Sequence, residues 1–265
     1  MRNIRSFLAA GALCVALVAP SASAFANSYE DIIASGKIRV STDLAIPPSG
    51  MLDADLKPIG SDVETAELLA KDWGLELEFV ETTGATRILN LQTNKADIVI
   101  STLSVTPQRA EVIDFSTPYA ALRSVIGAPA GLEIKDWEDL RGKTVTVTRG
   151  TTQDTELTAM ASERGFNVAR YDDDATMVTA AVSGQAQMVA TSETLVNQIG
   201  KRNTTLAFEP KFVIRTFDLA IGVRKNEPEL LEKLNDWVSE NLKNGKLNAI
   251  YEKYHGLSLP AEMLK

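Results

Sequence analysis

Cysteine and histidine are almost absent from this chain of 265 residues: each occurs once, as Cys14 and His255. One cysteine cannot form a disulfide framework within the chain, and a lone histidine without nearby cysteines or acids gives no basis for a metal site. Because no histidine accompanies a serine, Ser-His catalysis is unsupported. The motifs G-x-x-x-x-G-K-[ST], G-x-G-x-x-G and G-x-S-x-G do not occur. We therefore expect no metal, no cofactor and no catalytic residues.

Basic residues are in the minority, because 27 lysines and arginines stand against 35 aspartates and glutamates. The formal net charge of −8 disfavours nucleic acid or an anionic membrane surface as the main partner. Flexible glycine- and serine-rich linkers are missing, and the apolar run at residues 7–18 is too short to span a bilayer. With 45% hydrophobic residues, the chain can bury a substantial core in one large or two medium domains.

Residues 1–26 have the pattern of a secretory signal peptide. Two arginines precede the apolar run, and cleavage sites of the A-x-A type end at Ala24 and Ala26. Cys14 lies inside this segment, and Gly11 stands three residues before it, where lipoprotein processing requires a leucine. We therefore expect the segment to be removed, leaving a mature chain without a thiol. An exported chain with no later membrane span fits a bacterial periplasm best.

The remaining sequence alternates between strand and helix patterns, which predicts parallel sheets with crossover helices. In the first half we expect strands at 37–42, 75–81 and 96–101 and helices at 61–73 and 86–93. Ser61 or Asp62 would cap the helix at 61–73. The second half contains expected strands at 143–148, 168–171 and 186–191 and helices at 151–165, 174–183 and 194–200. A strand at 217–224 and a terminal helix pair then indicate a return to the first half.

This alternation predicts two α/β lobes joined by ordered strands, with a ligand cleft between them. We expect lobe 1 to include residues 27–121, lobe 2 to include residues 122–215, and residues 216–265 to return to lobe 1. Two crossings between lobes would allow the cleft to close on a small molecule.

The stretch STLSVTPQR, residues 101–109, has the features of a receptor for a small carboxylate. An apolar strand ends in hydroxyl residues, including Thr102 and Ser104, and a Thr-Pro pair then begins a helical turn that carries Arg109. Free backbone N–H groups and a guanidinium both favour a planar anion at the carboxyl end of a strand. Taken alone, the stretch is better explained as a polar surface loop with an arginine that pairs with a nearby carboxylate.

The surrounding segments carry a resemblance that decides between these alternatives. They are GKIRVSTD (36–43), NKADIVISTLSVTPQRAEVIDFSTPY (94–119), WEDLRGKTVTVTRGTTQD (137–154), and the tail segments FDLAIGVRKNEPEL and NGKLNAIYEKYHG. In this order they resemble the family 3 extracellular solute-binding proteins, the polar amino-acid receptors of bacterial ABC importers. The resemblance covers essentially the whole mature chain.

The family resemblance implies a two-lobed periplasmic-binding-protein fold of type II. Each lobe would contain a mixed, mainly parallel sheet flanked by helices. The protein would capture an amino acid or similar small carboxylate by lobe closure and deliver it to an inner-membrane ABC permease. The resemblance further implies a monomeric binding protein that is not an enzyme.

The resemblance also implies roles for individual residues. Arg109 would bind the carboxylate of the ligand, and Thr102 and Ser104 would offer hydroxyl or N–H groups. The G-T-T turn of the second lobe, which begins at Gly150 and includes Thr152, would donate N–H groups from a helix start to the same carboxylate.

Two positions depart from the family pattern. Ile46 stands where the family usually has an aromatic residue that stacks on the ligand, and Ser192 stands where an aspartate usually holds the ligand ammonium. Asp43 and Glu193 are the acids left near the cleft, so either could take that role, or the ligand lacks an α-amine. A favourable helix N-terminal position is the alternative explanation of Glu193, and an Asx turn is that of Asp43.

Gly84, Thr86 and Arg87 are expected to line the side-chain end of the pocket. Arg87 and Arg149 could favour an acidic ligand side chain, although ion pairing at the surface is the commoner role of such residues. An enzyme on the same fold is the alternative function, because periplasmic cyclohexadienyl (arogenate or prephenate) dehydratases resemble these receptors. Glu193 would then serve as a general acid.

Overall fold

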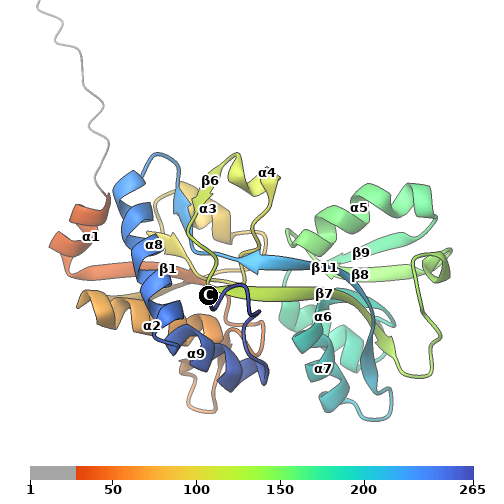
Figure 1. The fold of residues 1–265 in the computed structure, drawn as a ribbon. Coiled ribbons are helices and arrows are strands. Elements are labelled where there is room, and N and C mark those ends of the chain that lie inside the picture. Colours follow the sequence, from red (N-terminus) through yellow and green to blue (C-terminus); the bar gives the residue numbers. More distant parts are fainter. Residues whose placement is uncertain (1–27) are drawn as a thin grey trace, which may run out of the picture.

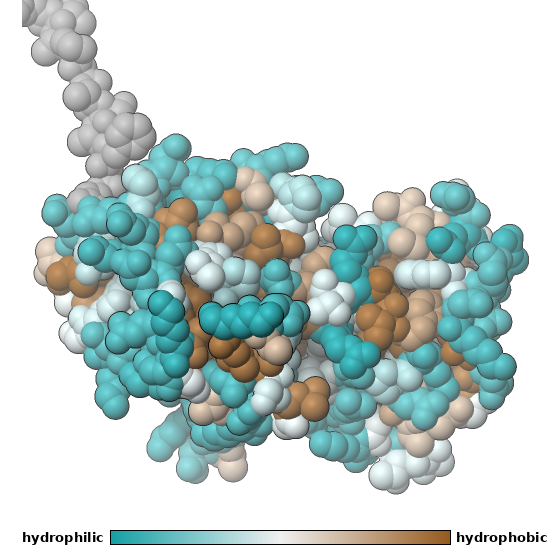
Figure 2. All heavy atoms as spheres, viewed as in Figure 1, coloured by the Kyte–Doolittle hydropathy of each residue, from teal (hydrophilic) through white to brown (hydrophobic). Residues whose placement is uncertain are grey.

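The computed structural model describes residues 28–265, so the predicted signal peptide lies outside the described residues. It has two lobes, each with its own sheet, joined by a pair of long strands (Figure 1). Figure 2 shows hydrophilic side chains over most of the visible face of both lobes. Between residues 28 and 265, no helix combines the length and apolar character needed to cross a membrane.

The first lobe is built on a five-stranded sheet in the order β4-β1-β5-β12-β6. β1 is parallel to β4 and β5, whereas β12 is antiparallel to β5 and β6. Its strands are β1 (Lys37–Thr42), β4 (Glu76–Glu81), β5 (Ile98–Val99), β6 (Ile113–Phe115) and β12 (Gly222–Arg224), with a small hairpin of β2 (Met51–Leu52) and β3 (Pro58–Ile59). Its helices are α1 (Ser28–Ser35), α2 (Ser61–Trp73), α3 (Arg87–Gln92), α4 (Pro107–Ala110), α8 (Pro228–Lys243) and α9 (Lys246–His255).

The second lobe is built on a five-stranded sheet in the order β11-β7-β10-β8-β9. β8 is parallel to β9 and β10, whereas β7 is antiparallel to β10 and β11. Its strands are β7 (Ala120–Pro129), β8 (Thr144–Thr148), β9 (Asn167–Tyr171), β10 (Val189–Ser192) and β11 (Phe208–Leu219). Its helices are α5 (Thr152–Arg164), α6 (Asp174–Val182) and α7 (Glu193–Arg202), with a 3-10 turn, η1 (Glu138–Leu140). Two mixed sheets flanked by helices confirm the predicted fold class.

The C-terminal segment completes the core of the first lobe. Ile38 of β1 and Leu69 of α2 are buried in one apolar cluster with Leu234 and Trp237 of α8. The indole Nε1 of Trp237 donates a hydrogen bond to Asp72 at 2.9 Å, which ties α8 to α2. Burial of side chains of this size supplies most of the stability of such a lobe. The helices that follow residue 227 thus pack against the first strand and helices of the chain.

The two lobes are joined by β7 and β11, which run side by side and antiparallel (Figure 1). At one end Ala120 and Leu219 pack in the core of the first lobe, and further along Val125 and Phe208 pack in the second. The two predicted lobe boundaries fall inside these strands. The connection is thus one hydrogen-bonded ribbon.

Some local predictions need correction. The helix at 61–73 ends at Gly74 in a left-handed conformation (φ 67°) as expected, but neither Ser61 nor Asp62 caps it. Gly60 is the N-cap, and both side chains lie within the helix. The expected strand at 217–224 is instead the end of β11 followed by β12, because the chain leaves one sheet and enters the other there. Hydrophobic alternation cannot show which sheet a strand joins.

Candidate functional site

A small cavity of about 30 Å³ lies between the two lobes. Side chains from both lobes line it, and most of them are polar or charged. They are Asp43, Ile46, Gly84, Arg87, Thr102, Ser104, Leu122, Thr151, Thr152, Gln153, Asp174, Thr191 and Ser192. A cavity of this volume has room for about two water molecules. The lobes are therefore closed on each other.

Gly84 and Gly150 bring the backbones of the two lobes into contact. A Cβ atom on Gly84 would lie 3.0 Å from the carbonyl oxygen of Arg149 and 3.2 Å from Cγ2 of Thr151. A Cβ atom on Gly150 would lie 2.8 Å from Cα of Ala85. Gly150 also has a left-handed backbone (φ 75°), whereas Gly84 does not. At Gly84, glycine is therefore needed for the close approach of the lobes and not for its backbone conformation.

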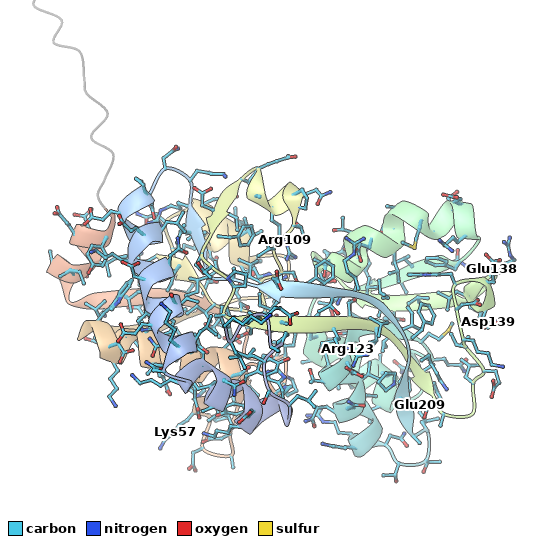
Figure 3. All side chains as sticks on the ribbon, viewed as in Figure 1. Lys57, Arg109, Arg123, Glu138, Asp139 and Glu209 are labelled. Carbon is cyan, nitrogen blue, oxygen red and sulfur yellow. The ribbon has the colours of Figure 1, made fainter. Side chains whose placement is uncertain are left out.

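Arg109 lies at the edge of the first lobe that faces the second lobe (Figure 3). Thr106 caps its short helix, accepting a hydrogen bond from the Arg109 N–H at 3.2 Å. The guanidinium donates to the carbonyl oxygens of Ser104 at 2.9 Å and Gly150 at 3.2 Å, so it bridges the lobes. It pairs with no carboxylate of the described residues. Burial, together with the nearby positive charge of Arg87, lowers the pKa of Arg109 to about 9.

Arg109 lines a groove of about 560 Å³ rather than the enclosed cavity. Thr152 lines both, so the two spaces adjoin at the start of α5. The groove also contains an ion pair between Arg215 and Glu156 at 3.0 Å. The guanidinium of Arg109 thus lies in the groove, and the groove meets the inner cavity at Thr152.

Two of the predicted N–H donors are engaged within the protein. The N–H of Thr102 donates to Asp62 at 2.7 Å, and the N–H of Gly150 donates to Asp154 at 3.1 Å. Thr152 is the first residue of α5, so its N–H has no partner within the helix. Of these three groups, the N–H of Thr152 thus fits its predicted role, and Thr102 can offer its hydroxyl.

Asp62 holds Thr102 in an unfavourable conformation. Thr102 has a left-handed backbone with φ 43°, which costs a threonine on the order of 1 kcal/mol or more. The Asp62 carboxylate, 2% exposed, also accepts a hydrogen bond from the hydroxyl of Tyr119 at 2.7 Å. Burial raises the pKa of Asp62 to about 6, and the two hydrogen bonds oppose this rise. The sequence pattern had suggested only a helix cap at this position.

The departures from the family pattern lie where the lobes meet. Ser192 lines the cavity and caps α7, accepting a hydrogen bond from the N–H of Leu195 at 3.2 Å. Glu193 does not line the cavity and forms an ion pair with Arg123 of β7 at 3.0 Å. Ile46 comes from the first lobe but packs in an apolar cluster of the second. It thus contributes to the contact between the lobes.

Arg87 is a buried cation on the wall of the cavity. It is 5% exposed, and one terminal nitrogen donates to the carbonyl oxygen of Ser101 at 2.7 Å. Its Nε finds no hydrogen-bond partner in the described chain. Burial lowers the pKa of Arg87, and the surrounding carboxylates oppose this. Arg149, the other arginine considered from the sequence, instead pairs with Asp172 at 2.9 Å at the surface.

Two aspartates from opposite lobes share this cavity with Arg87. Asp43, 4% exposed, accepts a hydrogen bond from the N–H of Ala45 at 2.9 Å. Asp174, 3% exposed, accepts one from the hydroxyl of Thr148 at 2.7 Å. Burial raises the pKa of Asp43, and it raises that of Asp174 to about 7. Within the described chain, neither aspartate forms an ion pair.

Asp174 was not singled out from the sequence, where it looked like the first residue of a helix. The available signal was the run of three aspartates at 172–174, which follows a strand and so lies at a carboxyl edge. Over residues 28–265, no group of three or more potential metal ligands occurs.

A cavity enclosed between two lobes and lined by polar groups from both is the architecture of a protein that captures a small polar solute. The comparison with protein families agrees with this class. The family model described as bacterial extracellular solute-binding proteins, family 3, matches residues 38–257. The chain belongs to this family.

Three similar proteins illustrate the relationship. The L-cystine-binding protein TcyJ of Escherichia coli (strain K12) is 30% identical over 252 residues, which cover 93% of this chain and 94% of TcyJ. The solved solute receptor for L-cysteine of Neisseria gonorrhoeae is 31% identical, with a TM-score of 0.79, over 85% of this chain and 92% of that chain. An ancestral amino acid-binding protein, described as a precursor of cyclohexadienyl dehydratase, is 32% identical and has a TM-score of 0.75. The match covers 85% of this chain and 98% of that chain.

Proposed function

We propose that this protein binds an amino acid or similar small carboxylate in the periplasm and delivers it to the membrane permease of an ABC importer. The family and the names of its relatives support an amino-acid ligand. The observation that carries the proposal is the state of Arg109. Its guanidinium lies between the lobes, partly desolvated, and forms hydrogen bonds to two carbonyl oxygens but no pair with an anion. A half-buried cation in that state favours a carboxylate.

In the proposed mechanism, the ligand carboxylate joins the two lobes. Arg109 and the hydroxyl of Ser104 receive it on the first lobe, and the N–H of Thr152 at the start of α5 receives it on the second. The lobes, with the boundaries expected from the sequence, move about β7 and β11. Ligand that contacts both lobes favours the closed form over the open form and so shifts the population toward it. The permease recognises the closed form.

The dehydratase alternative has no specific observation in its favour. Glu193, its candidate general acid, is paired with Arg123 and does not line the cavity. We therefore propose binding without turnover. Incubation of the protein with prephenate should give no phenylpyruvate. Formation of phenylpyruvate would support the dehydratase alternative.

A thermal-shift screen over the twenty proteinogenic L-amino acids, L-cystine and small dicarboxylates tests the proposal. A ligand at a hundred times its Kd stabilises the folded protein by ~2.7 kcal/mol, which such a screen detects. Calorimetry with the best ligand should then show at least a tenfold loss of affinity in Arg109→Ala, since an enclosed arginine–carboxylate pair contributes on the order of 2–4 kcal/mol.

Arg149→Ala is the matched control for this measurement. It removes an arginine next to Gly150 whose guanidinium pairs with Asp172 at the surface. Its affinity should equal that of the wild type. Unchanged affinity in Arg109→Ala, with an unchanged far-UV spectrum, would show that the carboxylate binds elsewhere.

A further inference from the structure

The structure leaves a second set of charged groups on the inner cavity, away from Arg109. We propose that Asp174 of the second lobe and Asp43 of the first lobe together hold an ammonium group of the ligand. The ligand is then an amine-bearing carboxylate with a neutral or basic side chain. This inference rests on the proposed function, because it concerns the other end of the same ligand.

The hydrogen bonding of the two aspartates shows unused acceptor capacity. Each carboxylate is more than nine-tenths buried, lines the cavity, and accepts one hydrogen bond from the described chain. An ionised carboxylate can accept about four hydrogen bonds, and an ammonium donates three. A buried carboxylate that lacks a partner is costly. An ammonium between Asp43 and Asp174 would fill the free positions and would also link the two lobes.

Arg87 provides independent evidence that a polar ligand group enters this cavity. It lines the same cavity, is 5% exposed, and has a buried Nε without a partner in the described chain. It forms no ion pair with Asp43 or Asp174, although its charge favours the ionised form of both. The three side chains therefore do not satisfy one another. Donor and acceptor groups are both left for a ligand.

The charges that line the inner cavity favour one class of ligand. Arg87 contributes one positive charge, and Asp43 and Asp174 contribute two negative charges when ionised. The ammonium of a zwitterionic ligand balances this negative excess. An acidic ligand side chain would add to the excess at short range in a poorly solvated space. A carboxylate without an amine would leave both cavity aspartates unpaired.

The position of Glu193 removes the other acid considered from the sequence. Its carboxylate is paired with Arg123 at 3.0 Å and lies outside the cavity lining. Ser192 does line the cavity, but a hydroxyl carries no charge to balance an ammonium. Asp174, at the start of α6, thus supplies the negative charge that the family usually has at position 192.

The test compares two probes on three proteins by calorimetry. The first probe is the tightest binder among the twenty L-amino acids and L-cystine, and the second is its analogue with each α-amine replaced by hydrogen. The proteins are the wild type, Asp174→Asn and the control Glu193→Gln. We expect the wild type to bind the amino acid at least tenfold more tightly than the analogue. Asp174→Asn should bind the amino acid with at least tenfold lower affinity than the wild type, and its affinity for the analogue should change little. Glu193→Gln should bind both probes with wild-type affinity.

Equal binding of both probes by the wild type would overturn the inference, as would unchanged amino-acid affinity in Asp174→Asn. If Asp174→Asn fails to fold, the wild-type comparison and the variant Asp43→Asn, with the same expected loss, decide the question. A wild type that binds a ligand of net negative charge most tightly, such as L-aspartate, L-glutamate or a dicarboxylate without an amine, also overturns the inference but leaves the proposed function standing. A wild type that binds none of these molecules overturns both.

Discussion

Replacing Gly84 with valine should weaken ligand binding by opposing closure of the lobes. All three atoms nearest to a Cβ at this position belong to residues 149–151 of the second lobe. The clash therefore exists only in the closed arrangement. A Cβ alone would lie 3.0 Å from the carbonyl oxygen of Arg149, and the two additional methyl groups of valine need still more room.

Overpacking of a close contact typically costs about 1–3 kcal/mol. If the whole cost falls on the closed form, the Kd of the ligand should rise by about 5- to 140-fold. Gly84 does not have a left-handed backbone, so valine adds no backbone strain of that kind to the open form. The melting temperature of the ligand-free open protein should therefore change little.

Calorimetry measures the affinity, and small-angle scattering with and without ligand measures the closure. Gly131→Val is the matched control, because a Cβ there meets nothing within 4 Å and its backbone is not left-handed. The control should bind and compact like the wild type. If Gly84→Val also binds with wild-type affinity and shows the same decrease in radius of gyration, the contact between residues 84–85 and 149–151 is not part of the ligand-bound form.

Two predictions concern the buried charges of the first lobe, and thermal melts of the ligand-free protein over a pH series test both. Burial raises the pKa of Asp62 to about 6, and its partners Thr102 and Tyr119 belong to the same lobe, so the folded protein holds a proton that the unfolded chain releases. The contribution of this proton to stability should be complete below the ordinary pKa of an aspartate and be lost as the pH rises through about 6; Asp62→Asn should reduce this loss, and an unchanged profile would contradict the assignment. Arg87→Met should destabilise the protein more at pH 8 than at pH 5, because the ionised aspartates lose their central cation; equal destabilisation would show that Arg87 acts through packing.

The predictions that succeeded depend on chemistry within a few residues. The Thr-Pro pair before Arg109 specifies a helix start wherever it lies in the fold, and the structure has Thr106 as the cap. Gly74 ends α2 for a similar local reason, since a left-handed residue at that position favours glycine. The order of such local signals along the chain predicted two α/β lobes with parallel sheets, and the mixed character of the sheets came from the family resemblance.

The parts of the site that sequence patterns missed depend on contacts across long distances in the chain. Nothing near Thr102 in the sequence indicates that Asp62 takes its N–H, and nothing near Arg87 indicates that its Nε lies buried. Glu193 shows a different limit. It follows Ser192 directly, but Ser192 ends β10 and caps α7 whereas Glu193 is the first residue of that helix, so one lines the cavity while the other meets Arg123.

The insertion of the second lobe between β7 and β11 has a consequence for biosynthesis. Apart from Ile46, the apolar clusters of the second lobe draw on residues 125–214, which form one continuous stretch. The core of the first lobe needs Leu234 and Trp237, which are synthesised after the whole of the second lobe. The second lobe can therefore fold early, whereas the lobe that carries Arg109 can fold only after α8 has been made.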